Sequence, residues 1–239
     1  FALTLGSATT DLTIHSTLAV DSSDSQLITN AADLILPYPL QLSAGLISST
    51  GGTFTLTQGG SLGSNNAILD VSGTILKLSD NLSAESGTLT SNNTSVLHLL
   101  DDVTLTFYGE KTFKNLEHND NTLSLGSGAT DLKLLDPLTL SSVTLHTGEG
   151  DLNLQGALTL QSDSLLDSTG GTLKLGGTVD STSEISLYGT ELALRNDLAI
   201  AGIMSTDASS SISRNTRELN LSGGWLKLGG TLELAGTIT

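Results

Sequence analysis

A ten-residue pattern recurs along this chain, about every 20 residues, and it constrains the fold more than any other feature. Each copy begins with an acidic residue, carries apolar residues at its second, fourth, eighth and tenth positions, and has a short polar break in its middle. The pattern occurs at 11–20, 33–42, 131–140, 151–160 and 191–200. A fixed period of this length is typical of repeat proteins, in which each unit buries its apolar side chains only by stacking on its neighbours.

Within each repeat, apolar and polar residues alternate over three to five positions, as they do in a half-buried strand. Gly-Gly, Ser-Gly, Ser-Asn and Asn-Asp pairs separate these runs, and such pairs supply the backbone conformations that corners need. We therefore predict an all-β fold, a single-stranded parallel β-helix (β-solenoid) with about 20 residues per coil and roughly 10–12 coils. In this fold Leu132, Leu152 and Leu173 would stack in one column.

A leucine-rich-repeat horseshoe is the alternative fold, because residues 135–140 fit the pattern Leu-x-x-Leu-x-Leu. The chain lacks the Asn position and the helical half-repeat that this architecture uses. The pattern therefore favours the solenoid.

We expect residues 1–239 to form a single β-solenoid segment, because the repeats run from one end of the chain to the other. The rhythm is interrupted near 96–121, which is rich in aromatic residues, and near 203–217, which is polar. Both stretches are expected to be irregular coils, either longer loops or a change of coil size. The chain starts and stops within the repeat pattern, so we interpret it as an excerpt of a longer polypeptide.

The charge balance restricts the classes of partner. Nine Lys and Arg residues face 25 Asp and Glu residues, for a net charge of −16. Nucleic acid is therefore not expected as a partner, since phosphate binding needs clustered cations. The chain has no cysteine, which excludes disulfides and thiolate metal sites. No apolar run reaches the ~18 residues of a membrane span, so we expect no membrane insertion.

Residues 111–140 resemble the Leu-, Thr- and Gly-rich repeats of large bacterial surface proteins. An aromatic–Asn–Leu element is followed by alternating leucines and glycine corners. The likeness is carried by Thr112, Phe113, Asn115, Leu116, Leu123, Leu125, Leu132, Leu134, Leu138 and Leu140. The pattern is similar to the passenger β-helices of autotransporter and filamentous-haemagglutinin-like adhesins. The resemblance implies a right-handed parallel β-helix that is exported to the cell surface and serves as an adhesin stalk or fibre.

The sequence assigns no catalytic, cofactor-binding or metal-binding residue. The histidines are His15, His98, His118 and His146, and only His98 and His118 have a spacing close to the coil period. We interpret them as solvated side chains on the outer face or at corners. No Gly-x-Ser-x-Gly elbow follows a strand and opens a helix, so no serine is a candidate nucleophile. We therefore expect no enzymatic activity.

A glycan-binding or glycan-cleaving β-helix is the alternative function. Glycan-cleaving enzymes need paired carboxylates, or a basic residue beside acids, commonly with aromatic platforms for the sugar rings. The residues that could supply these groups are Asp101, Asp102, Glu110 and Lys111, all within 96–121. The low aromatic content, 3%, and the scarcity of arginine argue against catalysis.

Calcium at Asx-rich turns is the one cofactor that the sequence suggests. Residues 21–24 and 118–121 are the densest groups of oxygen ligands. Neither matches the calcium-binding nonapeptide or the EF-hand loop, so we interpret both as turn-forming residues.

An ice- or mineral-binding solenoid is a further alternative. Outward Thr pairs occur at 53–57, 88–90 and 104–106, but such a face needs the pair in consecutive coils. Most coils carry other polar residues there, so the strand preference of Thr explains the pairs. Trp225 is interpreted as a covering residue near an interface.

The function that these observations predict is a non-catalytic structural or adhesive β-solenoid of a secreted or cell-surface bacterial fibre. Open coil edges can template further stacking, so end-to-end filaments are expected. The expected partners are further copies or a continuation of the chain, surface glycans, or receptors on host or neighbouring cells.

Overall fold

A computed structural model describes residues 2–5 and 10–229 of the chain. All regular elements in this part are β-strands, and the strand pairs are parallel. The strands wind as a β-solenoid of about 11 turns with roughly 21 residues per turn, which confirms the predicted fold class. Because the described residues contain no helix, the leucine-rich-repeat alternative is wrong.

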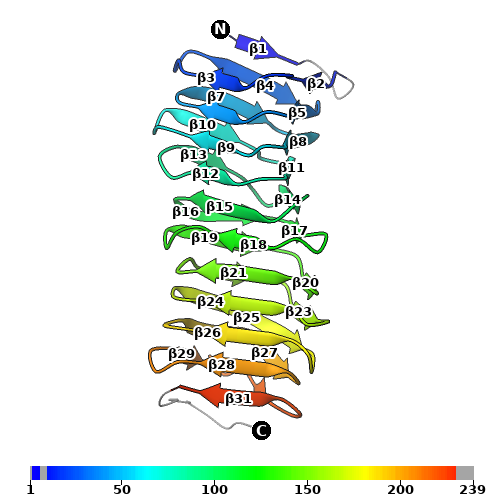
Figure 1. The fold of residues 1–239 in the computed structure, drawn as a ribbon, viewed down its shortest axis with the longest axis vertical. Coiled ribbons are helices and arrows are strands. Elements are labelled where there is room, and N and C mark those ends of the chain that lie inside the picture. Colours follow the sequence, from blue (N-terminus) through cyan, green and yellow to red (C-terminus); the bar gives the residue numbers. More distant parts are fainter. Residues whose placement is uncertain (1, 6–9, 230–239) are drawn as a thin grey trace. The chain divides into compact units, whose positions relative to one another are not determined.

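The chain divides into two compact units, Phe1–Asn121 and Thr122–Thr239. Three parallel sheets build the first unit, and successive coils add one strand to each (Figure 1). The first sheet contains β1 (Ala2–Thr4), β4 (Gln26–Asn30), β7 (Gly45–Ser49), β10 (Ala67–Asp70) and β13 (Thr88–Thr90). The second contains β2 (Leu12–Thr13), β5 (Leu34–Leu36), β8 (Thr53–Leu56), β11 (Ile75–Leu78), β14 (Val96–Leu99) and β17 (Asn115–Glu117). The third contains β3 (Leu18–Val20), β6 (Leu40–Leu42), β9 (Gly60–Leu62), β12 (Leu82–Ala84) and β15 (Val103–Phe107), and β16 (Gly109–Phe113) follows it.

Two parallel sheets build the second unit. One contains β18 (Leu123–Leu125), β21 (Thr144–Gly148), β24 (Leu165–Ser168), β26 (Glu184–Leu187), β28 (Ile203–Thr206) and β31 (Trp225–Leu228). The other contains β19 (Thr130–Leu134), β20 (Leu138–Ser141), β22 (Leu152–Leu154), β23 (Leu158–Gln161), β25 (Thr172–Val179), β27 (Glu191–Ile200), β29 (Ser211–Ser213) and β30 (Leu219–Asn220).

One glycine pair that the sequence places at a corner lies inside a strand. The Gly176–Gly177 pair reads as a corner in the sequence, yet it lies inside β25, which pairs with β22 through its first half and with β23 through its second. The register against β27 shifts between Leu175 and Gly177, so a bulge takes the place of the corner. A Cβ at Gly177, whose φ is +146°, would lie 1.9 Å from the Leu158 carbonyl oxygen. Only glycine allows the two backbones to approach this closely.

The core of each unit consists of leucine columns. Leu132 pairs in register with Leu152, and Leu152 with Leu173, as the repeat predicts. All three side chains are fully buried. In the first unit, Phe54 and Leu76 occupy equivalent places in a buried column. Burial of one such side chain contributes about 1.5–3 kcal/mol, and each is buried only because the coils beside it are present.

Buried and outer-face side chains alternate along the strands, as expected. Leu173 and Leu175 are buried while Lys174 between them is half-buried on the outer face. Corners use residues with positive φ, among them Gly52, Gly171 and the adjacent Asn119 and Asp120. These are conformations that Gly, Asn and Asp adopt at least cost.

The two stretches that interrupt the sequence rhythm contain regular strands. Residues 96–121 include β14, β15, β16 and β17, and Leu97 on β14 pairs in register with Leu116 on β17. This coil is therefore slightly shorter than the average turn of roughly 21 residues. Residues 203–217 include β28 and β29, joined by a turn.

Candidate functional site

Aspartate and asparagine side chains at the corners accept main-chain hydrogen bonds from an adjacent coil. Asp33 Oδ1 accepts the N–H of Thr53 at 2.7 Å, and Asp151 Oδ1 accepts that of Thr172 at 2.7 Å. The same contact joins Asp11 to the N–H of Asp33, Asn81 to Thr104, Asn92 to Gly73, Asp131 to Asp151, Asp180 to Ser162, Asp197 to Glu218 and Asp207 to Gly189. We call these contacts the inter-coil Asx bonds.

The inter-coil Asx bonds give the acid at the start of the repeat a physical role. Asp11, Asp33, Asp131 and Asp151 all open a copy of the pattern, and each carboxylate receives a backbone N–H from the following coil. A charged acceptor makes these bonds stronger than neutral ones. Part of the acidity of the chain is therefore structural. The sequence pattern showed the recurring acid, but its partner depends on the corner geometry.

Two of these carboxylates are held strongly in their charged form. The Ser183 hydroxyl and the N–H of Ser162 lower the pKa of Asp180 to about 2, although the carboxyl is exposed. The Gly189 N–H and nearby serine hydroxyls hold the pKa of Asp207 well below its usual range. Hydrogen bonds to the ionised form dominate in both cases.

The histidines lie on the outer face, as predicted, but two of them pair with carboxylates of the next coil. The His98 Nδ1 atom lies 3.0 Å from Glu117 Oε2, and the Asn119 amide nitrogen lies 2.6 Å from His98 Nε2. The register partner of His98 is therefore Glu117, although the sequence spacing of His98 and His118 is close to the coil period. The reason is the short coil, whose register places Glu117, and not the residue after it, beside His98.

The other histidines occupy separate sites. His146 Nδ1 lies 3.1 Å from Asp167 Oδ2, one coil further on. His118 Nδ1 accepts the N–H of Asp120 at 3.1 Å within its own turn. His15 is exposed. A search of the sequence at the coil spacing would have found the His146 pair.

The residues considered for glycan cleavage lie on either side of β15. Asp101 and Asp102 are exposed in the turn before this strand, where Asp101 Oδ1 accepts the Asp102 N–H at 2.8 Å. Glu110 and Lys111 follow the strand, on β16. Lys111 Nζ lies 6.0 Å from the centre of the Phe107 ring, and burial lowers the pKa of Lys111. The carboxylate pair and the lysine are thus placed by different corners.

The two oxygen-rich turns, at 21–24 and 118–121, form hydrogen bonds within the chain. Asp24 donates its N–H to Ser22 Oγ at 3.4 Å, and Asp21 and Asp24 are exposed. The Asn119 and Asn121 side-chain amides donate to the Leu99 carbonyl at 3.3 and 3.4 Å. Within residues 2–5 and 10–229, no group of three or more His, Cys, Asp or Glu side chains is arranged to hold a metal ion.

The threonines at 53–57 do not form a ladder. Thr55 stands between Ile35 and Lys77 in its column. A threonine column does occur in the second unit, where Thr139, Thr159 and Thr178 are successive register partners. It ends after three coils, where Ala199 follows Thr178.

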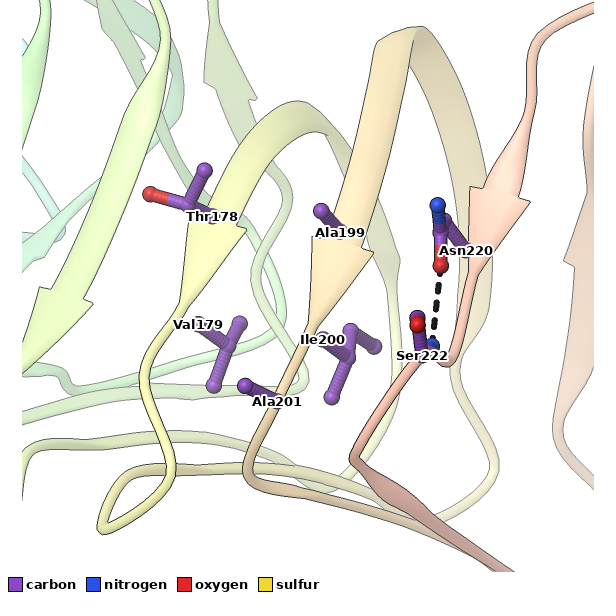
Figure 2. Close-up of a pocket in the computed structure, with 7 residues that line it drawn as sticks. All are labelled: Thr178, Val179, Ala199, Ile200, Ala201, Asn220 and Ser222. Atoms are coloured by element: carbon purple, nitrogen blue, oxygen red, sulfur yellow. Dashed lines mark hydrogen bonds between the residues drawn. The ribbon is translucent and has the colours of Figure 1, made fainter.

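A shallow hollow of about 240 Å³ lies on the second unit, over β25, β27 and the segment after β30. Its lining residues are Thr178, Val179, Ala199, Ile200, Ala201, Asn220 and Ser222 (Figure 2). Asn220 Oδ1 accepts the Ser222 N–H at 2.8 Å, so this amide oxygen stabilises the local turn. The hollow exists because the Ala199 and Ala201 side chains are too small to fill it. Trp225, on β31, is 72% exposed, and its register partner is Ile203.

Over the described ranges, no helix is long and apolar enough to cross a membrane. The chain matches no protein-family model, no curated protein and no solved structure.

Proposed function

We propose that this chain is a non-catalytic structural segment of a secreted or cell-surface bacterial fibre or adhesin. The main support for the proposal is that many polar side chains at the corners bind the protein's own main chain. Carboxylates and amides at the corners bind the main chain of an adjacent coil, as Asp33 binds Thr53 and Asp151 binds Thr172. Side chains committed to joining coils stiffen the stack.

The leucine columns and the parallel ladders support the same function. Each coil shares hydrogen bonds and buried apolar surface with the coil on either side, which resists bending and local opening. The remaining acidic surface keeps such an object in solution. The resemblance of residues 111–140 to adhesin repeats supports the location outside the cell.

We further propose that the stack is extended end to end, by another copy or by more of the same polypeptide. Support comes from β1, which lies at the edge of its sheet. Leu3 on β1 is 43% exposed, whereas its register partner Leu27 is buried. A coil laid on β1 would cover Leu3 and pair the free strand edge.

Sedimentation velocity of the whole chain over a wide concentration range tests the extension. We expect association that rises with concentration, and loss of association in Leu3→Lys, because a lysine at a strand edge opposes pairing. The matched control is Gln41→Lys, which adds a lysine at an exposed position on β6, a strand that has neighbours on both sides in its sheet. A wild-type chain that stays monomeric at every concentration would overturn extension by another copy, and association that survives in Leu3→Lys would overturn the role of the β1 edge.

A further inference from the structure

One face of the second unit carries a row of cationic and amide side chains. The row consists of Lys133 on β19, Asn153 on β22, Gln155 directly after β22, Lys174 on β25 and Arg195 on β27. We call it the cation–amide row. These strands belong to four consecutive coils of one parallel sheet.

The coil register aligns the row. Lys133 is the register partner of Asn153, and Asn153 is the partner of Lys174. These three residues therefore form one column on the outer side of the sheet, with Cα atoms about 4.8 Å apart, in which Lys133 and Lys174 are half-buried and Asn153 is 9% exposed. Four coils at this spacing extend over about 14 Å.

Hydrogen bonds order the amides and the arginine. The Arg195 Nη1 atom donates to Gln155 Oε1 at 3.0 Å, and Gln155 Nε2 donates to Asn153 Oδ1 at 3.1 Å. The Arg195 contact crosses the intervening strand β25, where the residue after Leu175 is Gly176. Ordered side chains lose less entropy when they bind a ligand.

The cations at one end of the row have no acidic partner. Among the described residues, no carboxylate lies within ion-pair distance of Lys174 or Arg195. Arg195 Nε is buried and has no hydrogen-bond acceptor there. Asp131, Asp151 and Glu191 lie in the neighbouring column; Asp131 and Asp151 each accept a main-chain N–H of the next coil, and Glu191 is exposed. Lys174 and Arg195 thus place positive charge on one face of a chain whose net charge is −16.

We propose that the cation–amide row binds an anionic polysaccharide that runs along the coil stack. Arg195 and Lys174 supply donors for carboxylate or sulfate groups, and arginine matches such groups in a planar geometry. Gln155 is half-buried and can both donate to and accept from sugar hydroxyls, while the buried Asn153 holds the Gln155 amide in place. A polymer suits the row better than a single ion, because the donors repeat from coil to coil over about 14 Å. The proposal goes beyond the structural role and does not depend on end-to-end association.

The probes are labelled polygalacturonate, labelled dextran sulfate, labelled neutral dextran and inorganic sulfate, measured by fluorescence anisotropy or calorimetry at low salt. We expect the chain to bind at least one of the two polyanions, to bind neutral dextran and inorganic sulfate at least tenfold more weakly, and to lose affinity as salt is added. The ratio of the affinities for polygalacturonate and dextran sulfate shows whether the row prefers carboxylate or sulfate groups. Lys174→Gln/Arg195→Gln should reduce affinity about tenfold or more, since each variant side chain loses a charged donor.

The matched control is Lys77→Gln/Lys227→Gln, which removes the same charge from other outward positions and should change affinity less than about twofold. Lys174→Gln alone is measured as well, because Lys174 makes no hydrogen bond among the described residues and its loss should not affect folding. The proposal is overturned if neither polyanion binds the wild-type chain, if both double variants lose affinity equally, or if the single and double variants of the row bind like wild type.

Discussion

Replacing Asp151 with alanine should remove a hydrogen bond that joins two coils of the second unit. Asp151 Oδ1 accepts the Thr172 N–H at 2.7 Å, and both residues are half-buried. Alanine leaves this N–H without its carboxylate acceptor. A hydrogen bond to a charged group contributes about 1.5–3 kcal/mol. Because water partly reaches the Asp151–Thr172 bond, we expect it to contribute about 1–2 kcal/mol.

Two further variants separate the hydrogen bond from the charge. Asp151→Asn keeps a side-chain oxygen that can accept from Thr172, so we expect it to lose less than half as much stability as Asp151→Ala. Glu85→Ala removes an exposed acid of the first unit and should be close to neutral.

Amide hydrogen exchange at Thr172, together with urea unfolding followed by circular dichroism, measures the effect. A loss of about 1–2 kcal/mol corresponds to about 5–30-fold weaker protection. Exchange of Thr172 at the wild-type rate in Asp151→Ala would contradict a stabilising role for this hydrogen bond. The same role is contradicted if Asp151→Asn and Glu85→Ala lose as much stability as the Asp151→Ala variant.

Three other perturbations test the core, the bulge and the charged corners. Leu152→Ala should lower the free energy of unfolding by about 2–5 kcal/mol in urea, and a loss below about 1 kcal/mol would contradict the buried column. Gly177→Ala should cost more than about 3 kcal/mol, because its Cβ would collide with the Leu158 carbonyl. At Gly223 φ is +91°, but no atom of the described residues lies within 4 Å of an added Cβ, so Gly223→Ala should cost only the backbone strain of about 1–2 kcal/mol; equal losses in the two glycine variants would count against the bulge. The pKa of Asp180, about 2 in the folded chain against 3.8 ordinarily, means that its stabilisation is present above about pH 4 and is lost as the pH falls toward 2. Asp180→Asn should therefore flatten the fall of the melting temperature between pH 4 and pH 2, and an unchanged slope would contradict the assignment.

The repeat period was sufficient to predict the columns but not every contact on the surface. Leu132, Leu152 and Leu173 stack because inward positions recur in each coil and tolerate small differences in coil length. Which residue of the next coil lies beside an outer-face side chain depends on the length of that one coil. The average sequence period brings His98 to His118, whereas the shorter coil in the structure brings it to Glu117.

The candidate binding features were harder to predict for the same reason. The acid that opens each repeat was visible, but its acceptor role depends on where a corner aims the main-chain N–H of the next coil. Lys133 and Lys174 lie two coils apart in the structure, and only the register through Asn153 shows that they share a column. The bulge at Gly177 has the same sequence signature as a corner, because glycine serves both.

Disulfide trapping between neighbouring coils probes the stacked parallel arrangement itself, since the chain contains no cysteine of its own. Thr139 and Thr159 are register partners, with an expected Cα separation of about 4.8 Å that suits a disulfide. Thr139 and Thr178 are two coils apart, about 9.6 Å, which is too far. We expect Thr139→Cys/Thr159→Cys to oxidise to an intramolecular disulfide, seen by mass spectrometry, while Thr139→Cys/Thr178→Cys keeps two free thiols. Failure of the first pair to close, or equal closure of both, would contradict the stacked parallel coils.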